Sequence, residues 1–395
     1  MAAGTTAPSP FMKGTHEMEG RLEFDRWFGR PGTLVLQPTT LCNLDCVYCY
    51  LPFRRLSREM SPEVAQAVAD SAADLIDRGG RLDIVWHGGE PLALGLCKFS
   101  ALLAPFEELR HAGRIQHSVQ TNATLIDNEW CDLLARHQVR VGVSIDGPAA
   151  LNARRVDLRG QPAFDRIVRG IGRLRDHGIR FSLIAVVGIE GIEQPESLLD
   201  FLAGLGPHTI GLNVEEMEGV NDQRCGITRD QAERFWKRVM DWRKAHSEGP
   251  ALRELERLTD YLHLARSGQS DQWCRYGLDP IPTVSVDGDV VLASPELAGI
   301  NDDAYGDFVA GNVCSQSIAG MLAQAHRLRY VAEFMTGLSR CQAECEFFDF
   351  CRGAQACNRY FENGSFATTE TDYCRLTRQA LITALYTSTK KEIAA

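Results

Sequence analysis

The stretch LCNLDCVYCY, residues 41–50, places Cys42, Cys46 and Cys49 within eight residues. Thiols in a cell are oxidised and bind metal ions, so three of them this close together indicate a metal site. A closed tetrahedral site needs four protein ligands. The stretch therefore raises the question of what occupies the fourth position.

The spacing of these cysteines is C-x3-C-x2-C. Zinc fingers and ribbons usually pair their cysteines as C-x2-C, with a second pair farther along the chain. A zinc knuckle with a remote fourth ligand stays an alternative. The spacing fits better a three-thiolate loop that holds a [4Fe–4S] cluster and leaves one iron free to bind a small molecule.

The composition of the whole chain is that of a globular protein. Its 395 residues suffice for two or three domains, and 44% of them are hydrophobic. A formal net charge of −10 argues against a nucleic-acid partner. Residues 1–20 show no signal-peptide pattern, and no apolar run is long enough to span a bilayer. We therefore expect a cytoplasmic protein without a membrane partner.

Many of the 13 cysteines cluster in two parts of the chain. Beside the N-terminal group, a second group comprises Cys341, Cys345, Cys351, Cys357 and Cys374. In a small secreted protein this pattern would indicate disulfides, but the length and the missing signal argue otherwise. Clustering in a reducing compartment indicates bound metal, as iron–sulfur or as zinc.

A repeated strand-then-helix pattern predicts the fold. The predicted strands are residues 33–38, 82–87, 114–120, 139–145, 180–187 and 208–214. The predicted helices are residues 62–76, 95–109, 127–137, 162–177 and 195–205. This alternation implies a parallel sheet with right-handed crossovers, and six such units can close into a partial barrel. Active sites of such folds lie at the C-terminal ends of the strands, and the cysteine loop directly follows the first strand.

The pattern changes after about residue 220. The later predicted elements are two charged helices in 228–268, a hairpin over 284–292 with an Asp287-Gly288 turn, and helices over 316–336 and 377–389. The stretch 341–374 is rich in Cys, Gly and Phe, which suits a small fold held together by metal. The expected parts are an N-terminal extension (1–30), a barrel core (31–220), a helical linker (221–270) and a Cys-rich domain (271–395).

The motif C-x3-C-x-Φ-C, with Tyr48 as the aromatic residue Φ, resembles the radical S-adenosylmethionine (SAM) superfamily. The resemblance implies a [4Fe–4S] cluster on Cys42, Cys46 and Cys49, whose open iron binds the amino and carboxylate groups of SAM. It also implies an α/β fold with a partial (β/α)6 TIM-like barrel, and a 5′-deoxyadenosyl radical that abstracts hydrogen from the substrate. A flavodoxin or ferredoxin would donate the electron.

Further motifs extend this resemblance. Gly88-Gly89-Glu90-Pro91 follows the second predicted strand, where the family has a turn beside the SAM amino group. By the same resemblance Ser144 contacts the SAM ribose and Asp146 stabilises its loop. Arg155 matches the arginine that binds the SAM carboxylate, with Arg154 as a competitor. Plain turns would also account for the Gly-Gly and Asp-Gly-Pro sequences.

The C-terminal cysteines resemble the SPASM and twitch-type extensions of radical SAM peptide maturases, which hold auxiliary iron–sulfur clusters. The pattern C-x3-C-x5-C-x22-C would ligate at least one auxiliary [4Fe–4S] cluster through Cys341, Cys345, Cys351 and Cys374. The candidates for further ligands are Cys274, Cys314 and Cys357. The predicted hairpin lacks the cysteine that the family often has there, so we expect a partial or absent second cluster.

Phrases at residues 212–222, 294–300, 311–313 and 358–374 resemble maturases of ribosomally made peptides, including those that form cyclophanes. The implied reaction joins an aromatic ring carbon to the β-carbon of a nearby residue of a precursor peptide. Glu296 is the candidate base for the departing proton, and Glu215 and Glu216 are candidate peptide contacts. A turn role for Glu296 and ion pairs for the other two glutamates remain alternatives.

Three other functions stay open at this point. Two are enzymatic, namely oxidation of a protein side chain, as in anaerobic sulfatase maturation, and thioether formation. The third is a non-enzymatic protein that holds a metal cluster and binds peptide.

Overall fold

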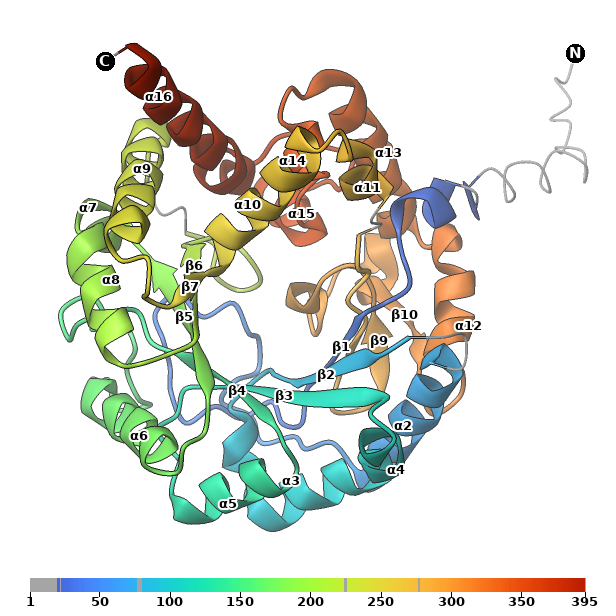
Figure 1. The fold of residues 1–395 in the computed structure, drawn as a ribbon. Helices are drawn as coiled ribbons and strands as arrows, with labels where there is room; N and C mark the ends of the chain where they lie inside the picture. The colour runs from blue at the N-terminus through green and yellow to red at the C-terminus, as the bar shows by residue number, and fades with distance from the viewer. Residues whose placement is uncertain (1–19, 22, 77–79, 224–225, 276–277, 395) are drawn as a thin grey trace, which may run out of the picture.

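The computed structural model describes residues 20–21, 23–76, 80–223, 226–275 and 278–394. Most of the predicted N-terminal extension lies outside these ranges. Within them the chain forms a ten-stranded sheet with the strand order β10-β9-β8-β1-β2-β3-β4-β5-β6-β7. The sheet curls into an open barrel with helices around its outer face (Figure 1).

Parallel strands in sequence order form most of the barrel wall. They are β1 (Thr33–Leu36), β2 (Leu82–Trp86), β3 (Ile115–Thr121), β4 (Arg140–Ser144), β5 (Phe181–Val187) and β6 (Thr209–Val214). Each of them pairs in parallel with the next. Burial alternates along β2, β3 and β5, because one face of the sheet meets the helices and the other faces the barrel interior. The predicted parallel α/β core is confirmed.

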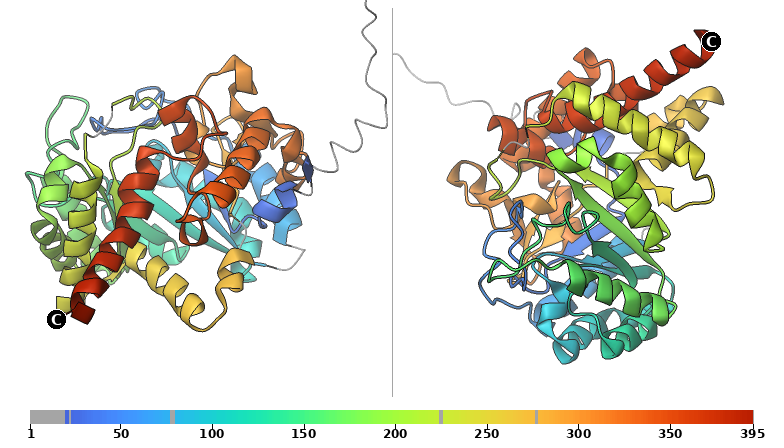
Figure 2. Two further views of the ribbon diagram at one scale, coloured as in Figure 1. Left: turned by 90° about the horizontal axis from the view of Figure 1, so that it is seen from above. Right: turned by 90° about the vertical axis from the view of Figure 1, so that its left-hand side faces the viewer.

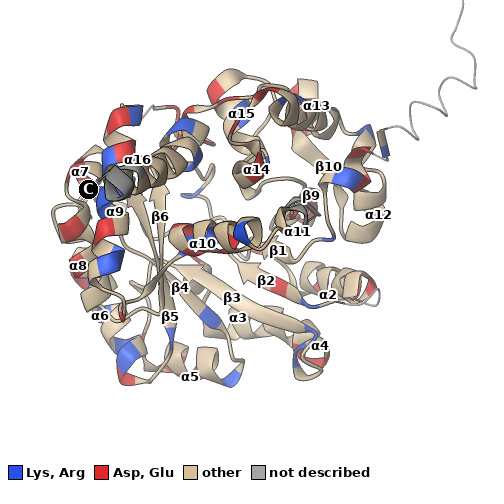
Figure 3. Cartoon of the chain, turned by 45° about the horizontal axis from the view of Figure 1, so that its top comes forward, with Lys and Arg blue, Asp and Glu red and all other residues tan. Residues whose placement is uncertain are grey.

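The helices that cover this sheet are α2 (Pro62–Ile76), α3 (Leu96–Leu103), α4 (Glu107–His111), α5 (Asn128–Arg136), α6 (Phe164–Asp176), α7 (Ile189–Glu193) and α8 (Pro195–Gly204). The Ser61 hydroxyl accepts a hydrogen bond from the Val64 N–H (3.3 Å) at the start of α2, as an N-cap does. The helix predicted over 95–109 is divided by a 3-10 turn at Pro105, which lacks an N–H. Charged residues of both signs lie mainly on the helices rather than on the strands (Figure 3).

One edge of the sheet gains a strand that was not predicted. β7 (Ala251–Leu252) lies between the two charged helices α9 (Arg229–Ala245) and α10 (Arg253–Arg266). It pairs in parallel with β6. The helices predicted over 228–268 are therefore present, and the segment that joins them continues the barrel sheet.

The opposite end of the sheet contains the predicted hairpin, and β10 (Val309–Asn312) is the edge strand there. The strands of the hairpin are β8 (Thr283–Val284) and β9 (Asp289–Val291), and β8 pairs in parallel with β1. β10, which was not predicted, pairs antiparallel with β9. The hairpin is thus part of the barrel sheet rather than of a separate sheet.

The Cys-rich end of the chain is mostly helical. Its helices are α11 (Ser270–Arg275), α12 (Ile318–Ala323), α13 (Arg329–Glu344), α14 (Phe348–Cys351), α15 (Ala356–Asn363) and α16 (Ala380–Ala394). The helix predicted over 316–336 is divided into α12 and α13, and a π-helical turn precedes the closing helix α16. Helix α16 runs alongside α9 (Figures 1 and 2). Among the described segments no helix combines the length and apolarity needed to cross a bilayer.

Residues 23–30, the described end of the predicted extension, pack on this Cys-rich region. Trp27 and Phe28 are buried. The Trp27 ring meets Phe348 of α14 edge-on with 5.6 Å between centroids, and Phe28 lies 5.8 Å from Phe334 of α13. Aromatic contacts of this kind fasten the start of the chain to the helices that carry the C-terminal cysteines.

Replacement of Trp27 by alanine tests these contacts. Because Trp27 is 3% exposed, its removal leaves a cavity, and we expect the free energy of unfolding to fall by about 3–5 kcal/mol. Denaturant unfolding under anaerobic conditions measures the change. Leu158→Ala, at a side chain that is 53% exposed, is the control and should change the value by less than about 0.5 kcal/mol. Equal effects of the two replacements would contradict the stabilising role of Trp27.

Candidate active site

The C-terminal ends of the parallel strands border a cavity of about 350 Å³. The predicted site residues on its wall are Cys42, Cys46, Tyr48, Cys49, Gly89, Glu90, Ser144, Arg155, Glu215, Glu216 and Glu296. Gly88, the predicted site residue next to Gly89, does not line this cavity. Residues from motifs as far apart in the sequence as Cys42 and Glu296 thus meet at the edge of the sheet where active sites of parallel α/β folds lie.

Backbone hydrogen bonds hold the cysteine loop in place. The Cys42 N–H donates to the Arg54 carbonyl (2.8 Å), and the Asp45 N–H donates to the Val156 carbonyl (2.7 Å). Burial raises the pKa of the Cys42 thiol and raises that of Cys46 to about 11. These thiols therefore need a nearby positive charge to be deprotonated, and the iron ions of a cluster provide it.

The Gly-Gly-Glu turn after β2 supports the cysteine loop directly. Gly89 has a φ of +61°, and a Cβ at this position would lie 2.5 Å from the Leu41 carbonyl oxygen. The Glu90 N–H donates to that same carbonyl (2.8 Å). At Gly88, with φ +96°, a Cβ would lie 2.9 Å from the Gln37 side chain. The close approach that requires glycine is therefore to the protein's own backbone at Gly89 and to the Gln37 side chain at Gly88, whereas the resemblance places this turn beside the SAM amino group.

The carboxylate of Glu90 is buried and joins this turn to β3. It accepts hydrogen bonds from the Thr121 hydroxyl (2.6 Å), the Asn122 N–H (2.8 Å) and the Leu92 N–H (3.1 Å). Burial raises the Glu90 pKa to about 7. The Asn122 side chain also lies 4.0 Å from the Cys42 sulfur, a contact that no predicted motif indicated. Glu90 thus connects the cysteine loop to the end of β3 and stabilises the position of the loop.

A buried ion pair orients two predicted SAM contacts. The Arg155 guanidinium donates from Nε (2.9 Å) and Nη2 (2.8 Å) to the two oxygens of Asp146. The Tyr48 hydroxyl donates to the same carboxylate, and the Arg155 guanidinium lies 5.5 Å from the Tyr48 ring centroid. Asp146 also accepts from the Val186 N–H (2.9 Å). The position of Arg155 at the cavity wall is therefore fixed by the protein itself.

The competing arginine has a different partner. Arg154 forms a two-pronged ion pair with Glu215, with 2.7 Å between Nη2 and Oε1. Glu215 lines the cavity, whereas Arg154 is not one of its lining residues. The two arginines, which the sequence could not distinguish, therefore have different partners, and only Arg155 lines the cavity. Glu215 forms an ion pair, which was the alternative to its role as a peptide contact.

Two polar pairs complete this part of the wall. The Ser144 hydroxyl accepts from the Gln120 amide (2.8 Å). His87 Nε2 and the Tyr50 hydroxyl lie 2.8 Å apart, and burial lowers the His87 pKa to about 4, so the ring is neutral at pH 7. Sequence reasoning missed His87 and Tyr50. The position of His87 directly after β2, at the end of a parallel strand, is the signal that could have found it.

Three glutamates gather on the wall from two distant segments. Glu216 and Glu218 follow β6, and Glu296 lies in a 3-10 turn after β9. Carboxylate oxygens of Glu218 and Glu296 and the sulfur of Cys357 lie within 4.8 Å of one another. Burial raises the pKa of Glu296 and of Glu218, and it raises that of Glu216 to about 8. Glu216 can therefore hold and release a proton near neutral pH, and Glu218 and Glu296 keep their protons to a higher pH than exposed glutamates do.

The four predicted auxiliary ligands converge in one enclosed cavity. Its lining includes Cys341, Cys345, Cys351, Cys374 and Arg378. A hydrogen bond from Cys351 lowers the pKa of the Cys374 thiol to about 6. The Nε of Arg378 is buried there without a hydrogen-bond partner. Four thiols beside a buried cation fit an anionic iron–sulfur cluster in both number and chemistry.

The remaining cysteine candidates do not meet in a comparable way. Cys314 is exposed in the loop after β10, whereas Cys357 is buried in α15 beside Glu296. The side chain of Cys274 lies outside the described residues. In the parts of the chain that the structure describes, these cysteines do not assemble a second four-thiol site.

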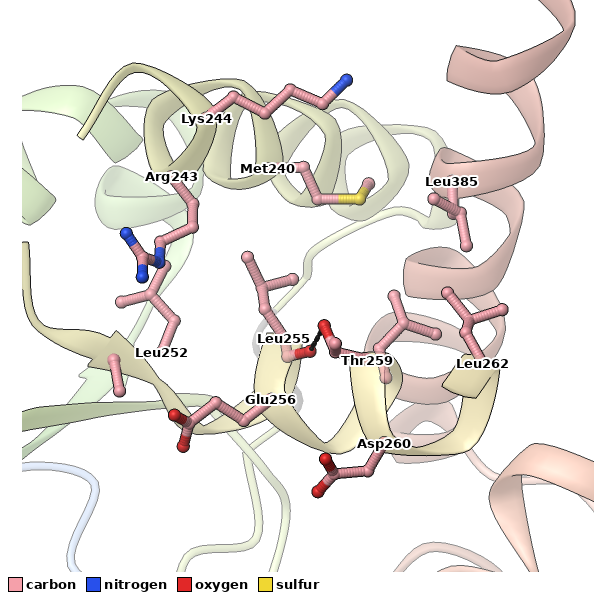
Figure 4. A pocket seen from close by; sticks show the side chains of 12 residues that line it. Met240, Arg243, Lys244, Leu252, Leu255, Glu256, Thr259, Asp260, Leu262 and Leu385 are labelled. Atoms are coloured by element: carbon pink, nitrogen blue, oxygen red, sulfur yellow. Dashed lines mark hydrogen bonds between the residues drawn. The ribbon is translucent and has the colours of Figure 1, made fainter. Parts of the chain in front are cut away.

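A separate cavity of about 640 Å³ lies between α9, α10 and α16 (Figure 4). Its apolar lining residues include Met240, Leu252, Leu255, Leu262 and Leu385. It contains none of the predicted site residues, so its size alone does not make it the active site.

Comparisons with known proteins assign the chain to a family. The model of the radical SAM superfamily matches residues 36–202. An uncharacterized protein of Synechocystis sp. is 32% identical over 361 residues, which cover 88% of this chain and 89% of that protein. The chain belongs to the radical SAM superfamily. It is therefore an enzyme, and its cofactors are a [4Fe–4S] cluster and SAM.

Relatives with an assigned activity match a smaller part of the chain. The serine-type anaerobic sulfatase-maturating enzyme of Bacteroides thetaiotaomicron is 31% identical over 191 residues, and this match spans 46% of each chain. The chain thus spans about half the length of that enzyme.

Two solved structures share the fold. Native anSMEcpe with bound AdoMet and Cp18Cys peptide has a TM-score of 0.72 at 19% identity, over 90% of this chain and 97% of that chain. Streptococcus suis SuiB bound to precursor peptide SuiA has a TM-score of 0.66 at 20% identity, over 94% of this chain and 82% of that chain. At 19% and 20% identity, these two structures show that this enzyme shares their fold.

Gly89→Ala tests the contact between the turn and the cysteine loop. The added Cβ would collide with the Leu41 carbonyl, so we expect the loop to shift and the bound iron and SAM to fall well below the wild-type amounts. Iron analysis and SAM binding after anaerobic reconstitution measure this. Gly95→Ala is the matched control, because Gly95 has φ +84° but a Cβ added there would meet no atom within 4 Å. A loss of iron and SAM that is the same in both variants would contradict the role of the contact.

Proposed function

We propose that this enzyme modifies a ribosomally made precursor peptide by joining an aromatic ring carbon to the β-carbon of a nearby residue, which forms a cyclophane. The observation that carries the proposal is the shared cavity wall, where the predicted SAM contacts meet a group of half-buried glutamates, namely Glu216, Glu218 and Glu296. A peptide substrate is supported by the fold shared with two peptide-bound structures. The phrases that resemble cyclophane-forming maturases support the cross-link.

The residues around the cysteine loop would hold the radical-generating cofactors. Cys42, Cys46 and Cys49 would bind the [4Fe–4S] cluster, which together with SAM supplies a 5′-deoxyadenosyl radical. Ser144 would contact the SAM ribose and Arg155 its carboxylate. Because Asp146 already orients Arg155, little side-chain entropy is lost when SAM binds.

The roles of Tyr48 and of the Gly-Gly-Glu turn follow from their contacts. Tyr48 would close the SAM site from the side of the Asp146 ion pair. Gly88, Gly89 and Glu90 would keep the cysteine loop at the correct depth and expose backbone groups to the SAM amino group. These residues bind and orient SAM, and they exclude water.

Formation of each link removes two hydrogens from the peptide. One leaves as a hydrogen atom to the adenosyl radical, and the other leaves the ring as a proton together with an electron. Glu296 would accept this proton, and Glu216 and Glu218 beside it could pass it on. Cys341, Cys345, Cys351 and Cys374 would hold an auxiliary [4Fe–4S] cluster that supplies an electron acceptor.

We propose that the chain has four functional parts, although three of them contribute strands to the same sheet. Residues 31–220 form the radical SAM core, 221–270 the helical linker and 271–395 a SPASM-like domain, with 1–30 as an extension. The linker contributes β7 and the SPASM-like part contributes β8 to the barrel sheet. The α15 residue Asn358 donates to Glu216 (2.6 Å), so the SPASM-like part also contacts the glutamate group.

Side-chain oxidation, as in sulfatase maturation, is the second candidate function. It is favoured by the sequence match to the Bacteroides thetaiotaomicron enzyme and by the shared fold of anSMEcpe. The two reactions leave different products, because oxidation yields an aldehyde that reacts with hydrazides and cross-linking does not.

Mass spectrometry of a co-expressed precursor peptide tests the cross-link. We expect a loss of two hydrogens per link, a fragmentation gap across the linked residues, and no reaction with hydrazide. The Cys42→Ser enzyme should leave the peptide unchanged, since the SAM-binding cluster would lack one of its three thiolates. A peptide of unchanged mass in the presence of enzyme that cleaves SAM would contradict the proposal, and a hydrazide-reactive product would favour the second candidate.

Glu296→Gln tests the proposed base. We expect cross-linking to slow by about 10²–10⁴-fold while 5′-deoxyadenosine still forms, because the base acts after hydrogen abstraction. Since burial raises the Glu296 pKa, the wild-type rate should rise with pH as this carboxyl loses its proton, and the variant should lose that rise. Glu256→Gln is the control, because Glu256 is exposed and does not line the active-site cavity. A variant with wild-type rate and pH profile would show that Glu296 is not the base.

A further inference from the structure

A buried arginine lies against one of the proposed auxiliary ligands. Arg359 of α15 is 1% exposed. Its Nη2 donates to the sulfur of Cys341 (3.2 Å) and to the Gly353 carbonyl (2.9 Å), and its Nη1 donates to the Thr368 carbonyl (2.7 Å). Backbone carbonyls thus hold the guanidinium in one orientation, with an N–H directed at the thiol.

The charge of Arg359 has no carboxylate partner among the described residues. Its contacts are the Cys341 thiol, backbone carbonyls and the ring of Phe334, whose centroid is 5.0 Å away. A buried charge without a counter-charge is strongly unfavourable. Deprotonated thiolates at the adjacent cysteines would provide the missing negative charge.

A glycine in helix α13 leaves space for the Arg359 side chain. Gly337 lies inside α13, where a Cβ would be 2.1 Å from the Arg359 Nη1. Glycine inside a helix weakens it relative to alanine, so its presence here needs a local reason. The guanidinium is the nearest group to that Cβ, and the carbonyl oxygens of Phe366 (2.6 Å) and Thr368 (3.0 Å) also fill the space.

A second arginine lies beside the four cysteines. Arg378 lines the enclosed cavity together with them, and its Nε is buried without a hydrogen-bond partner. Four thiolates outweigh the positive charge of a [4Fe–4S] core, so the bound cluster is anionic. Two buried guanidinium groups would balance that charge.

We propose that Arg359 positions Cys341 and raises the reduction potential of an auxiliary cluster held by Cys341, Cys345, Cys351 and Cys374. This inference rests on the proposed function, because it takes these four cysteines as cluster ligands. A fixed cation stabilises the reduced state, which carries one more negative charge, more than the oxidised state. A higher potential suits a cluster that accepts the electron released when the peptide ring regains aromaticity.

A redox titration of the anaerobically reconstituted full-length enzyme, monitored by electron paramagnetic resonance, tests the proposal. Arg359→Met removes the charge and keeps the apolar length of the side chain. We expect the reduction equilibrium constant of the auxiliary cluster to fall at least tenfold, which is about 59 mV for a one-electron couple. Arg359→Lys should retain most of the wild-type potential. The SAM-binding cluster is the internal reference and should not shift.

A second variant reaches the same contact without replacing the arginine. Gly337→Ala should push the guanidinium away from Cys341 and lower the potential in the same direction. Gly172→Ala is the control, because Gly172 also lies in a helix, α6, but has open space around it. An unchanged potential in both Arg359→Met and Gly337→Ala would overturn the proposal.

The remaining outcomes are also decisive. Loss of the auxiliary cluster from Arg359→Met but not from Arg359→Lys would show that the positive charge at this position stabilises the cluster. Equal loss from both variants would show that the shape of the arginine side chain matters instead, and would overturn the proposal. Because the readout involves no peptide, its failure is distinct from failure of the proposed function. A wild-type enzyme that cross-links peptide but shows no auxiliary cluster would overturn this inference alone.

Discussion

The structure around the cavity depends on the contact between the turn after β2 and the cysteine loop after β1. At Gly89 a Cβ would lie 2.5 Å from the Leu41 carbonyl, so only glycine allows the two backbones to approach this closely. Glu90 then joins both segments to the end of β3 through its N–H and its buried carboxylate. These hydrogen bonds connect the C-terminal ends of β1, β2 and β3. They thereby fix the positions of the three thiols in the cysteine loop.

The other parts of the cavity are organised by charge. The Asp146–Arg155 pair fixes Tyr48 and the predicted SAM carboxylate contact, and the Arg154–Glu215 pair lies beside it. The C-terminal region adds Glu296, and through Asn358 it also contacts the glutamates after β6. In the proposed reaction the departing hydrogen atom, proton and electron would thus find separate acceptors around one cavity, and the fold brings together the chain segments that provide them.

Local patterns explain what the sequence could predict. The helix over 62–76 was found to the residue because Ser61, Pro62 and its apolar spacing act within a few positions of one another. β7 has two residues, too few for any period, and the pairing of β8 with β1 joins segments some 250 positions apart. The sites follow the same rule. Cysteine spacing indicated candidate ligands. The different partners of Arg154 and Arg155, the neutral His87–Tyr50 pair and the contact of Arg359 with Cys341 depend on tertiary neighbours that no motif specifies.

Radical formation by this enzyme requires that Cys42, Cys46 and Cys49 leave one iron open and that SAM binds to it. Electron–nuclear double resonance of the reduced enzyme, with SAM labelled at the amino nitrogen and the carboxylate oxygens, tests this binding. We expect hyperfine coupling from both labels to the reduced cluster, and loss of the coupling in Cys46→Ser. Absence of coupling in enzyme that has bound labelled SAM, or coupling that persists without Cys46, would contradict this mode of binding.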